Sequence, residues 1–101
     1  RDMNQKDRVI RYMDLYHSIT PIEAFRDLGI TKLATVIGLI KRDGKSIYQY
    51  YQKGKNRFGE TCYFMRYWNN YQQYLHDLQD IVIEEERLEN ATKRVYWWIK
   101  T

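Results

Sequence analysis

The apolar positions of the first 44 residues recur at the three- and four-residue spacing of amphipathic helices. The first of these helices is predicted to begin after Asn4, whose side chain can cap it, and to run to about Tyr16. Its expected core-facing positions are Val9, Ile10, Met13 and Tyr16. His17 and Ser18 then connect it to the next helix.

Residues 18–44 contain two helix starts and two helix stops. Thr20, Pro21 and Glu23 predict a capping box with proline at the first helical position, where its missing N–H costs nothing. The short apolar stripe that follows consists of Ala24, Phe25 and Leu28. Gly29 then supplies the left-handed residue that ends this helix.

The next helix is predicted between Thr31, which can cap it, and Gly44, which ends it. Ile30 is expected to pack inward in the turn before it. The expected inward face consists of Leu33, Ala34, Ile37 and Ile40. Lys41 and Arg42 occupy the last turn, where cations suit the helix dipole. Two short helices joined by a tight glycine turn indicate a helix-turn-helix.

After Gly44 the pattern changes from helix to strand. Residues 46–52 and 61–68 are rich in strand-forming side chains, and residues 53–59 between them form a turn with two glycines and three basic residues. A β-hairpin with a basic tip, placed after a helix-turn-helix, is typical of a wing. We therefore predict an α+β fold that is mainly α: a winged helix-turn-helix domain of three helices and a hairpin over residues 3–68.

Residues 69–101 are predicted to form an added C-terminal helical extension. Its apolar residues at helical spacing are Tyr71, Tyr74, Leu75, Leu78, Ile81 and Val82. Three glutamates interrupt this stripe and are interpreted as a solvated face: Glu84, Glu85 and Glu86. The helix is expected over residues 70–90, whereas residues 91–101 fit either a helix or a strand.

The 101 residues suffice for one domain, and their net charge of +4 is unevenly distributed. Residues 1–68 hold 13 basic and 7 acidic residues, a net charge of +6. Residues 69–101 hold 4 basic and 6 acidic residues, a net charge of −2. The basic part of the chain suits a phosphate backbone, and it also suits an acidic protein surface.

Catalysis has little support in the sequence. We find no nucleophile–base pair, no Gly-rich phosphate loop and no paired carboxylates, and therefore predict a protein that is not an enzyme and has no cofactor. His17 and His76 alone do not make a metal-ligand cluster. The single Cys62 excludes an internal disulfide, and no apolar run is long enough to span a membrane. These features predict a protein of the reducing cytoplasm, without a membrane partner.

Three segments carry a more specific resemblance: residues 3–10 (MNQKDRVI), 18–34 (SITPIEAFRDLGITKLA) and 56–59 (NRFG). They resemble a small winged helix-turn-helix domain family that is common in bacteriophages and mobile elements of Gram-positive bacteria. The resemblance covers about residues 3–68. It implies a winged-helix fold, binding to double-stranded DNA and the cytoplasm of a bacterial host cell.

In a DNA-binding winged helix, the second helix of the motif enters the major groove. The expected outward positions of that helix are Lys32, Thr35, Val36, Leu39 and Arg42. The candidate base-edge contacts among them are Lys32, Thr35 and Arg42. The candidate phosphate contacts in the wing are Lys53, Lys55 and Arg57. The alternative for these wing residues is a solvated loop that protects the hairpin from edge aggregation.

Val36 and Leu39 depart from the family, which often has a basic residue near the first position and charged residues near the second. Gly38 between them offers nothing to a base edge. Three interpretations stay open for the two apolar side chains: packing under the wing or the C-terminal helix, a face that binds a protein, and contact with bases.

The hairpin carries tyrosines at alternating positions: Tyr48, Tyr50, Tyr51, Tyr63 and Tyr67. Cross-strand pairing within the sheet accounts for most of them. Tyrosines that point outward suit a protein interface or stacking on unpaired bases. Phe58 is expected to pack on the hydrophobic core rather than to wedge between bases.

Trp97 and Trp98 are adjacent, so they point in different directions on either a helix or a strand. We expect one to pack on its own domain and the other on a partner chain, with the C-terminal helix forming a homodimer. The alternative is a helix folded back on its own domain. The candidate protein-binding residues are Val36, Leu39, Tyr71, Leu75, Leu78, Trp97 and Trp98.

Two functional hypotheses follow. The first is a winged-helix DNA-binding protein of a phage or mobile element, acting as a dimeric transcriptional regulator. The second is a phage-encoded protein that uses the winged-helix scaffold to bind a host protein and inhibit a host defence or host enzyme, for example as an anti-CRISPR protein.

Overall fold

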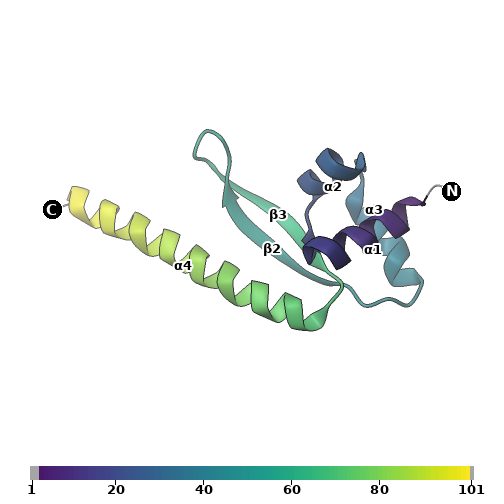
Figure 1. Ribbon diagram of the computed structural model, residues 1–101. Helices are drawn as coiled ribbons and strands as arrows, with labels where there is room; N and C mark the ends of the chain where they lie inside the picture. Colours follow the sequence, from purple (N-terminus) through teal and green to yellow (C-terminus); the bar gives the residue numbers. More distant parts are fainter. Residues whose placement is uncertain (1–2, 101) are drawn as a thin grey trace.

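The structure is a computed structural model that describes the backbone of residues 3–100 and the side chains of residues 3–87. It is a small, mainly helical α+β domain, in which the described residues form four helices and a three-stranded antiparallel sheet (Figure 1). In chain order the elements are α1 (Gln5–Tyr16), β1 (Ser18–Ile19), α2 (Pro21–Leu28), α3 (Leu33–Arg42), β2 (Tyr48–Lys55), β3 (Thr61–Trp68) and α4 (Tyr71–Lys100).

The starts of the first two helices agree with the sequence signals. The Asn4 side chain caps α1 by accepting a hydrogen bond from the Asp7 backbone N–H at 2.9 Å. Both halves of the capping box of α2 are present between Thr20 and Glu23. Gly29 ends α2 in the left-handed region, with φ of 69°.

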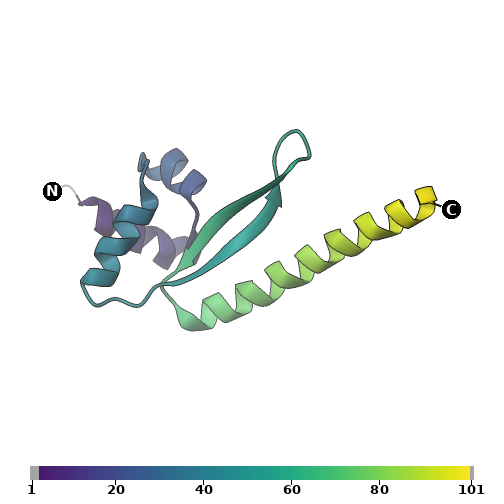
Figure 2. The ribbon, with the colours of Figure 1, turned by 180° about the vertical axis from the view of Figure 1, so that it is seen from behind.

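The start of α3 differs from the prediction. Lys32, not Thr31, occupies the N-cap position, and no side chain caps the helix. Ala34, predicted to face inward, is exposed, while Leu33, Ile37 and Ile40 are buried as predicted. The end of α3 is close to the predicted one, with Lys41 and Arg42 in its last turn. Figure 2 shows the chain leaving α3 and running into the hairpin.

The sheet contains a strand that the sequence did not indicate. Ser18, predicted as part of the connection to the next helix, and Ile19 form β1 and pair antiparallel with Trp68 and Tyr67 of β3. The strand order is β1-β3-β2, so β3 lies in the centre and β2 forms one edge. The hairpin is in register from Tyr48 opposite Trp68 to Lys55 opposite Thr61.

The hydrophobic core lies between α1, α2, α3 and the base of the sheet. Its buried members are Val9, Tyr12, Met13, Ile19, Ala24, Ile30, Leu33, Val36, Ile37, Ile40 and Tyr67. Tyr16 was predicted to belong to it but is 64% exposed, and Tyr12 is buried in its place. Tyr12 is the better anchor because its hydroxyl donates a hydrogen bond to Asp27 at 2.6 Å. Phe25, assigned to the apolar stripe of α2, is 63% exposed.

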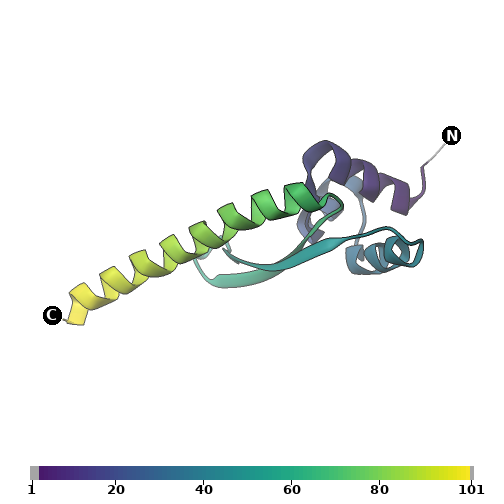
Figure 3. The ribbon, with the colours of Figure 1, turned by 90° about the horizontal axis from the view of Figure 1, so that it is seen from below.

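The last helix, α4, is continuous to Lys100, so the backbone of residues 91–100 is helical and not a strand. It packs on the sheet face that carries Tyr48 and Trp68, whereas Tyr67, from the opposite face of β3, enters the core. Its C-terminal part extends past the hairpin (Figures 1 and 3). Among the helices in the described part of the chain, none is long and apolar enough to cross a membrane.

Candidate nucleic-acid interface

The third helix presents a polar, cationic side to solvent. Lys32, Thr35 and Arg42 are all exposed, as the sequence predicted. Leu39 is 39% exposed. The expectation that Val36 points outward is wrong, because its side chain is 3% exposed and belongs to the core. Val36 therefore forms no part of a docking face.

The burial of Val36 follows from helical spacing. It lies three residues after Leu33 and four before Ile40, so all three side chains share one side of α3. Counting the helical spacing of three and four residues from the buried Leu33 would therefore have predicted that Val36 lies in the core. The α3 surface that remains for a ligand is less apolar than the sequence suggested.

The last turn of α3 lies beside the start of the hairpin. The Lys41 ammonium donates a hydrogen bond to Oε1 of Gln49 on β2 at 3.0 Å. At the C-cap, the Asp43 carboxylate accepts a hydrogen bond from Lys6 at 2.7 Å, and this bond holds the pKa of Asp43 below its ordinary value. The negative charge of Asp43 at the end of α3 is thus balanced by Lys6. The cations of the last turn of α3 are therefore available to an anionic ligand.

One face of the hairpin turns away from α4, and we call it the outward hairpin face. It consists of Gln49, Tyr51, Lys53, Lys55, Thr61, Tyr63 and Met65. Strand alternation places these side chains together, and none of them is acidic. This face is therefore neutral or positive along its whole length.

The cations of the hairpin are placed differently from the prediction. Lys53 and Lys55 were assigned to the turn, but β2 continues through both of them, and only Arg57 lies in the connecting loop. All three residues are exposed. In the described part of the chain, none of the three forms an ion pair. The two lysines are consequently held on a strand, which fixes their spacing more firmly than a loop.

The hairpin loop is ordered by Asn56. Its side-chain oxygen accepts hydrogen bonds from the backbone N–H groups of Phe58 at 2.9 Å and Glu60 at 3.0 Å. The prediction that Phe58 packs on the core is wrong, because the side chain is 83% exposed at the tip of the hairpin. The core lies at the other end of the hairpin, too far along the strands for Phe58 to reach it.

Glu85 of α4 caps one backbone N–H on the free edge of the sheet. Its carboxylate accepts hydrogen bonds from the Tyr50 hydroxyl and from the Lys53 backbone N–H, each at 2.8 Å. The hydrogen bond to Glu85, followed by burial, raises the pKa of Tyr50. Glu85 was interpreted as part of a solvated face, but it is half-buried and holds the hairpin against α4.

Aromatic contacts fix the base of α4. The Tyr74 ring stacks on Tyr48 at 5.4 Å and meets Trp68 edge-on at 5.1 Å. The indole N–H of the fully buried Trp68 donates to Asp77 at 2.9 Å. Tyr71 also contacts Tyr48 and is half exposed.

The other candidate protein-binding positions are distributed along α4. Leu75 is 40% exposed and Leu78 is partly buried. Trp97 and Trp98 lie outside the residues whose side chains are described.

A basic residue that the sequence reasoning missed joins the hairpin to α2. Arg66 donates hydrogen bonds to Ser18 and Gln52, each at 2.9 Å, and lies 3.7 Å from the Glu23 carboxylate. The guanidinium also lies 6.0 Å from the centre of the Phe64 ring. Two of its three nitrogens bond inside the domain, so Arg66 holds the hairpin against β1 and α2.

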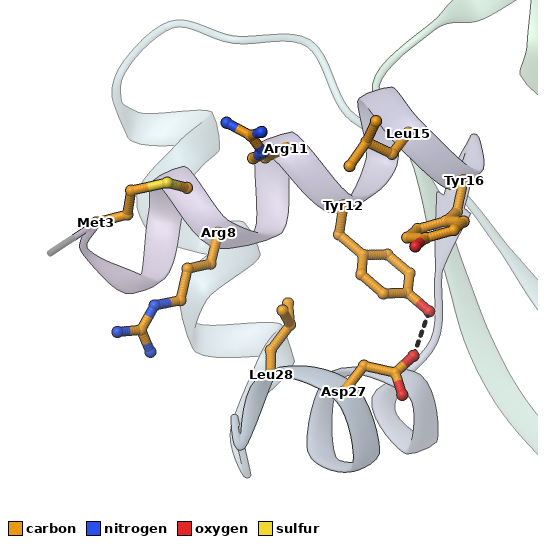
Figure 4. Close-up of a pocket in the computed structure, with 8 residues that line it drawn as sticks. All are labelled: Met3, Arg8, Arg11, Tyr12, Leu15, Tyr16, Asp27 and Leu28. Carbon is orange, nitrogen blue, oxygen red and sulfur yellow. Dashed lines mark hydrogen bonds between the residues drawn. The ribbon is translucent and has the colours of Figure 1, made fainter.

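A separate groove of about 290 Å³ lies between α1 and α2 (Figure 4). Its lining consists of Met3, Arg8, Arg11, Tyr12, Leu15, Tyr16, Asp27 and Leu28. Hydrogen bonds from Arg26 and then from Tyr12 lower the pKa of Asp27 to about 2, so this carboxylate is ionised and already partnered. The groove thus combines exposed apolar side chains with two arginines.

Among the side chains that the structure describes, those of residues 3–87, no three of His, Cys, Asp or Glu come together in a way that could hold a metal ion. No family model, no curated protein and no solved structure matches the chain. Any functional conclusion therefore depends on the geometry described above.

Proposed function

We propose that this protein is a winged-helix protein of a phage or mobile element that binds double-stranded DNA. In this proposal α3 is the helix that enters the major groove, and the β2–β3 hairpin is the wing. The observation that carries the proposal is the cationic side of α3, whose C-cap carboxylate Asp43 is paired with Lys6, together with its continuation across the Lys41–Gln49 hydrogen bond onto the carboxylate-free outward hairpin face.

The order of the elements supports the winged-helix assignment. Three helices pack around one core, a two-residue strand lies between the first two, and an antiparallel hairpin follows the third. The end of α3 and the base of the hairpin are joined by the Lys41–Gln49 hydrogen bond, so both elements could touch one stretch of DNA, as a winged helix requires. Arg66 and Glu85 hold the hairpin at a fixed angle to the helices.

The exposed side chains divide into two roles. Thr35 and Arg42 on α3 are the candidates for contacts with base edges, since hydroxyl and guanidinium groups both find partners in the major groove. Lys53, Lys55 and Arg57 on the wing are the candidates for phosphate contacts, which position a protein without reading sequence. Lys32, at the start of α3, suits either role.

The regulator hypothesis adds a dimer. An exposed apolar line on α4 that includes Leu75 and Val82 is available for a second copy of the chain. A dimer through α4 would place two copies of α3 on successive half-sites of an operator. Sedimentation velocity of the wild type and a Leu75→Glu/Val82→Glu variant tests this step, because a dimer through this line becomes a monomer when both charges are introduced.

Chemical-shift mapping tests the DNA proposal. A ¹⁵N-labelled sample titrated with a 16-base-pair duplex of random sequence should show its largest shifts at Thr35 and Arg42 and along residues 53–57. The groove between α1 and α2 serves as the internal control and should be unaffected. Shifts confined to that groove, or no shifts at low salt, would contradict the proposal.

A second candidate function is binding of a host protein, as an inhibitor would do, and the groove between α1 and α2 favours it. Leu15 and Tyr16 beside this groove are 60% and 64% exposed, and Arg8 and Arg11 line it. This chemistry suits an acidic segment with an apolar anchor. Arg8→Glu/Arg11→Glu should abolish such binding and leave duplex binding unchanged, so the two functions can be separated.

A further inference from the structure

We infer that Tyr51 and Tyr63 form a stacking site for unpaired bases, so that the nucleic acid bound by this protein contains a junction between a duplex and a single strand. This inference rests on the proposed DNA-binding function and specifies its substrate. The evidence for it is the geometry of the outward hairpin face. In the duplex-binding proposal, only the lysines of this face contact the DNA.

The two tyrosine rings are presented to solvent as a pair. They lie on neighbouring strands, with ring centres 5.3 Å apart and an angle of 18° between the ring planes. Tyr51 is 60% exposed and Tyr63 is 53% exposed. Both rings are carried by paired strands, so little further ordering is needed when a ligand stacks on them.

The aromatic residues on the other side of the hairpin show that this exposure is selective. Tyr48 is partly buried and Trp68 is fully buried, because α4 covers that face and Tyr74 packs against both rings. Helix α4 leaves the outward face open. A cross-strand tyrosine pair stabilises a hairpin only modestly. This small contribution to stability does not explain why both rings are about half exposed.

The surroundings of the pair suit a polyanion with flat apolar groups. Lys53 is directly opposite Tyr63 across the strands, and Lys55 follows on the same face. Aromatic rings flanked by cations are the arrangement by which proteins bind single-stranded nucleic acids, with bases stacking on rings and phosphates pairing with ammonium groups. The face contains no carboxylate that would repel phosphates.

Stacking on a ring requires an unpaired base. Between its ends a duplex buries the flat faces of its bases and offers only their edges in the grooves, so the interior of double-stranded DNA cannot use the tyrosine rings in this way. Gln49, which accepts the hydrogen bond from Lys41 of α3, is two residues before Tyr51 on the same face, a separation of about 7 Å along the strand. A duplex end on α3 would therefore leave its first unpaired bases beside the rings.

The test compares three oligonucleotides of the same sequence at one salt concentration: a blunt 16-base-pair duplex, the same duplex with a five-nucleotide single-stranded extension, and the single strand alone. Fluorescence anisotropy should show that the extension tightens binding about 5- to 100-fold, the range expected for stacking one base. Tyr51→Ala/Tyr63→Ala should remove that gain and leave the affinity for the blunt duplex unchanged. Tyr51→Phe/Tyr63→Phe, which keeps both rings, should retain it.

A second readout does not depend on a variant. A 2-aminopurine placed in the extension should lose fluorescence when the wild-type protein binds, because stacking quenches it. Equal affinity for the blunt and extended duplexes, without quenching, would overturn the stacking site and leave duplex binding intact. Binding to the single strand alone, with none to the blunt duplex, would instead overturn the proposed duplex function and, with it, the inferred junction between a duplex and a single strand.

Discussion

The carboxylate of Glu85 accepts a hydrogen bond from the backbone N–H of Lys53 at 2.8 Å and so joins the last helix to the edge of the hairpin. An unpaired edge strand otherwise exposes its N–H groups to other chains. The same carboxylate holds the Tyr50 hydroxyl, so one side chain fixes both the edge and the angle of the hairpin. This contact links α4, which covers the opposite face of the hairpin, to the position of the lysines on the proposed DNA surface.

Removing this contact should loosen the hairpin. Glu85→Ala is expected to lower the free energy of unfolding by about 1.5 to 3 kcal/mol, because it removes hydrogen bonds to a charged carboxylate. Urea denaturation measures the change, and amide exchange at Lys53 should accelerate. Glu84→Ala is the matched control, because Glu84 is exposed and, among the described side chains, bonds only to Arg87 within its own helix. A Glu85 variant as stable as the control would show that the contact contributes nothing.

The orientation of α3 gives a second prediction. Val36→Glu should abolish folding or lower the melting temperature sharply, because it introduces a charge into a side chain that is 3% exposed. Leu39→Glu should leave a cooperative melt close to that of the wild type, since this side chain is 39% exposed. Circular dichroism melts measure both. Equal effects of the two substitutions would contradict the orientation of α3.

The buried indole of Trp68 depends on Asp77. Burial disfavours the charge of Asp77, but hydrogen bonds from Trp68, Gln73 and His76 outweigh it and hold the pKa of Asp77 below its ordinary value. A lowered pKa contributes stability that is present above the unfolded-state value of 3.8 and is lost as the pH falls through the lower folded-state value. Between pH 5 and pH 2 the wild type should therefore lose stability more steeply than Asp77→Asn. Parallel losses in the two proteins would refute this role.

At alkaline pH the sign is reversed for Tyr12. Burial and the hydrogen bond to Asp27 raise the pKa of Tyr12 from 10.0 to about 12. Because this pKa is raised in the folded protein, the contribution of the neutral Tyr12 hydroxyl to the free energy of unfolding is fully present below pH 10. It is lost as the pH rises through about 12. Denaturation midpoints between pH 9 and pH 12 should fall more for the wild type than for Tyr12→Phe, which has no hydroxyl to ionise. The same fall in both would contradict the assignment.

The parts of the fold that local chemistry determines could be predicted from the sequence. The caps at Asn4 and Thr20, the stop at Gly29 and the extent of β3 depend on residues close together in the chain, and the structure agrees with each of them. The α+β, mainly helical class followed from the same signals. The winged-helix assignment and its DNA contacts remain predictions.

The predictions from the sequence are wrong where residues distant in the chain determine whether a residue joins a strand or the core. Ser18 becomes part of a strand because Trp68, fifty residues later, pairs with it. Lys53 stays in β2 because pairing with Tyr63 and the bond to Glu85 continue the strand beyond the point at which Gly54 suggested a turn. Tyr12 displaces Tyr16 from the core because Asp27 of α2 supplies a partner for its hydroxyl. None of these partners is visible from local sequence.

The central claim, that α3 and the hairpin form one duplex-binding surface, is tested most directly by the salt dependence of binding to a random-sequence duplex. Anisotropy titrations at several salt concentrations should give an affinity that falls steeply with salt, with a log–log slope of about −0.9 for each phosphate contacted. Replacing Lys53, Lys55 and Arg57 together by alanine should make the slope shallower by about 2 to 3 and weaken binding to every sequence. An unchanged slope in that variant, or no binding by the wild type at low salt, would contradict the claim.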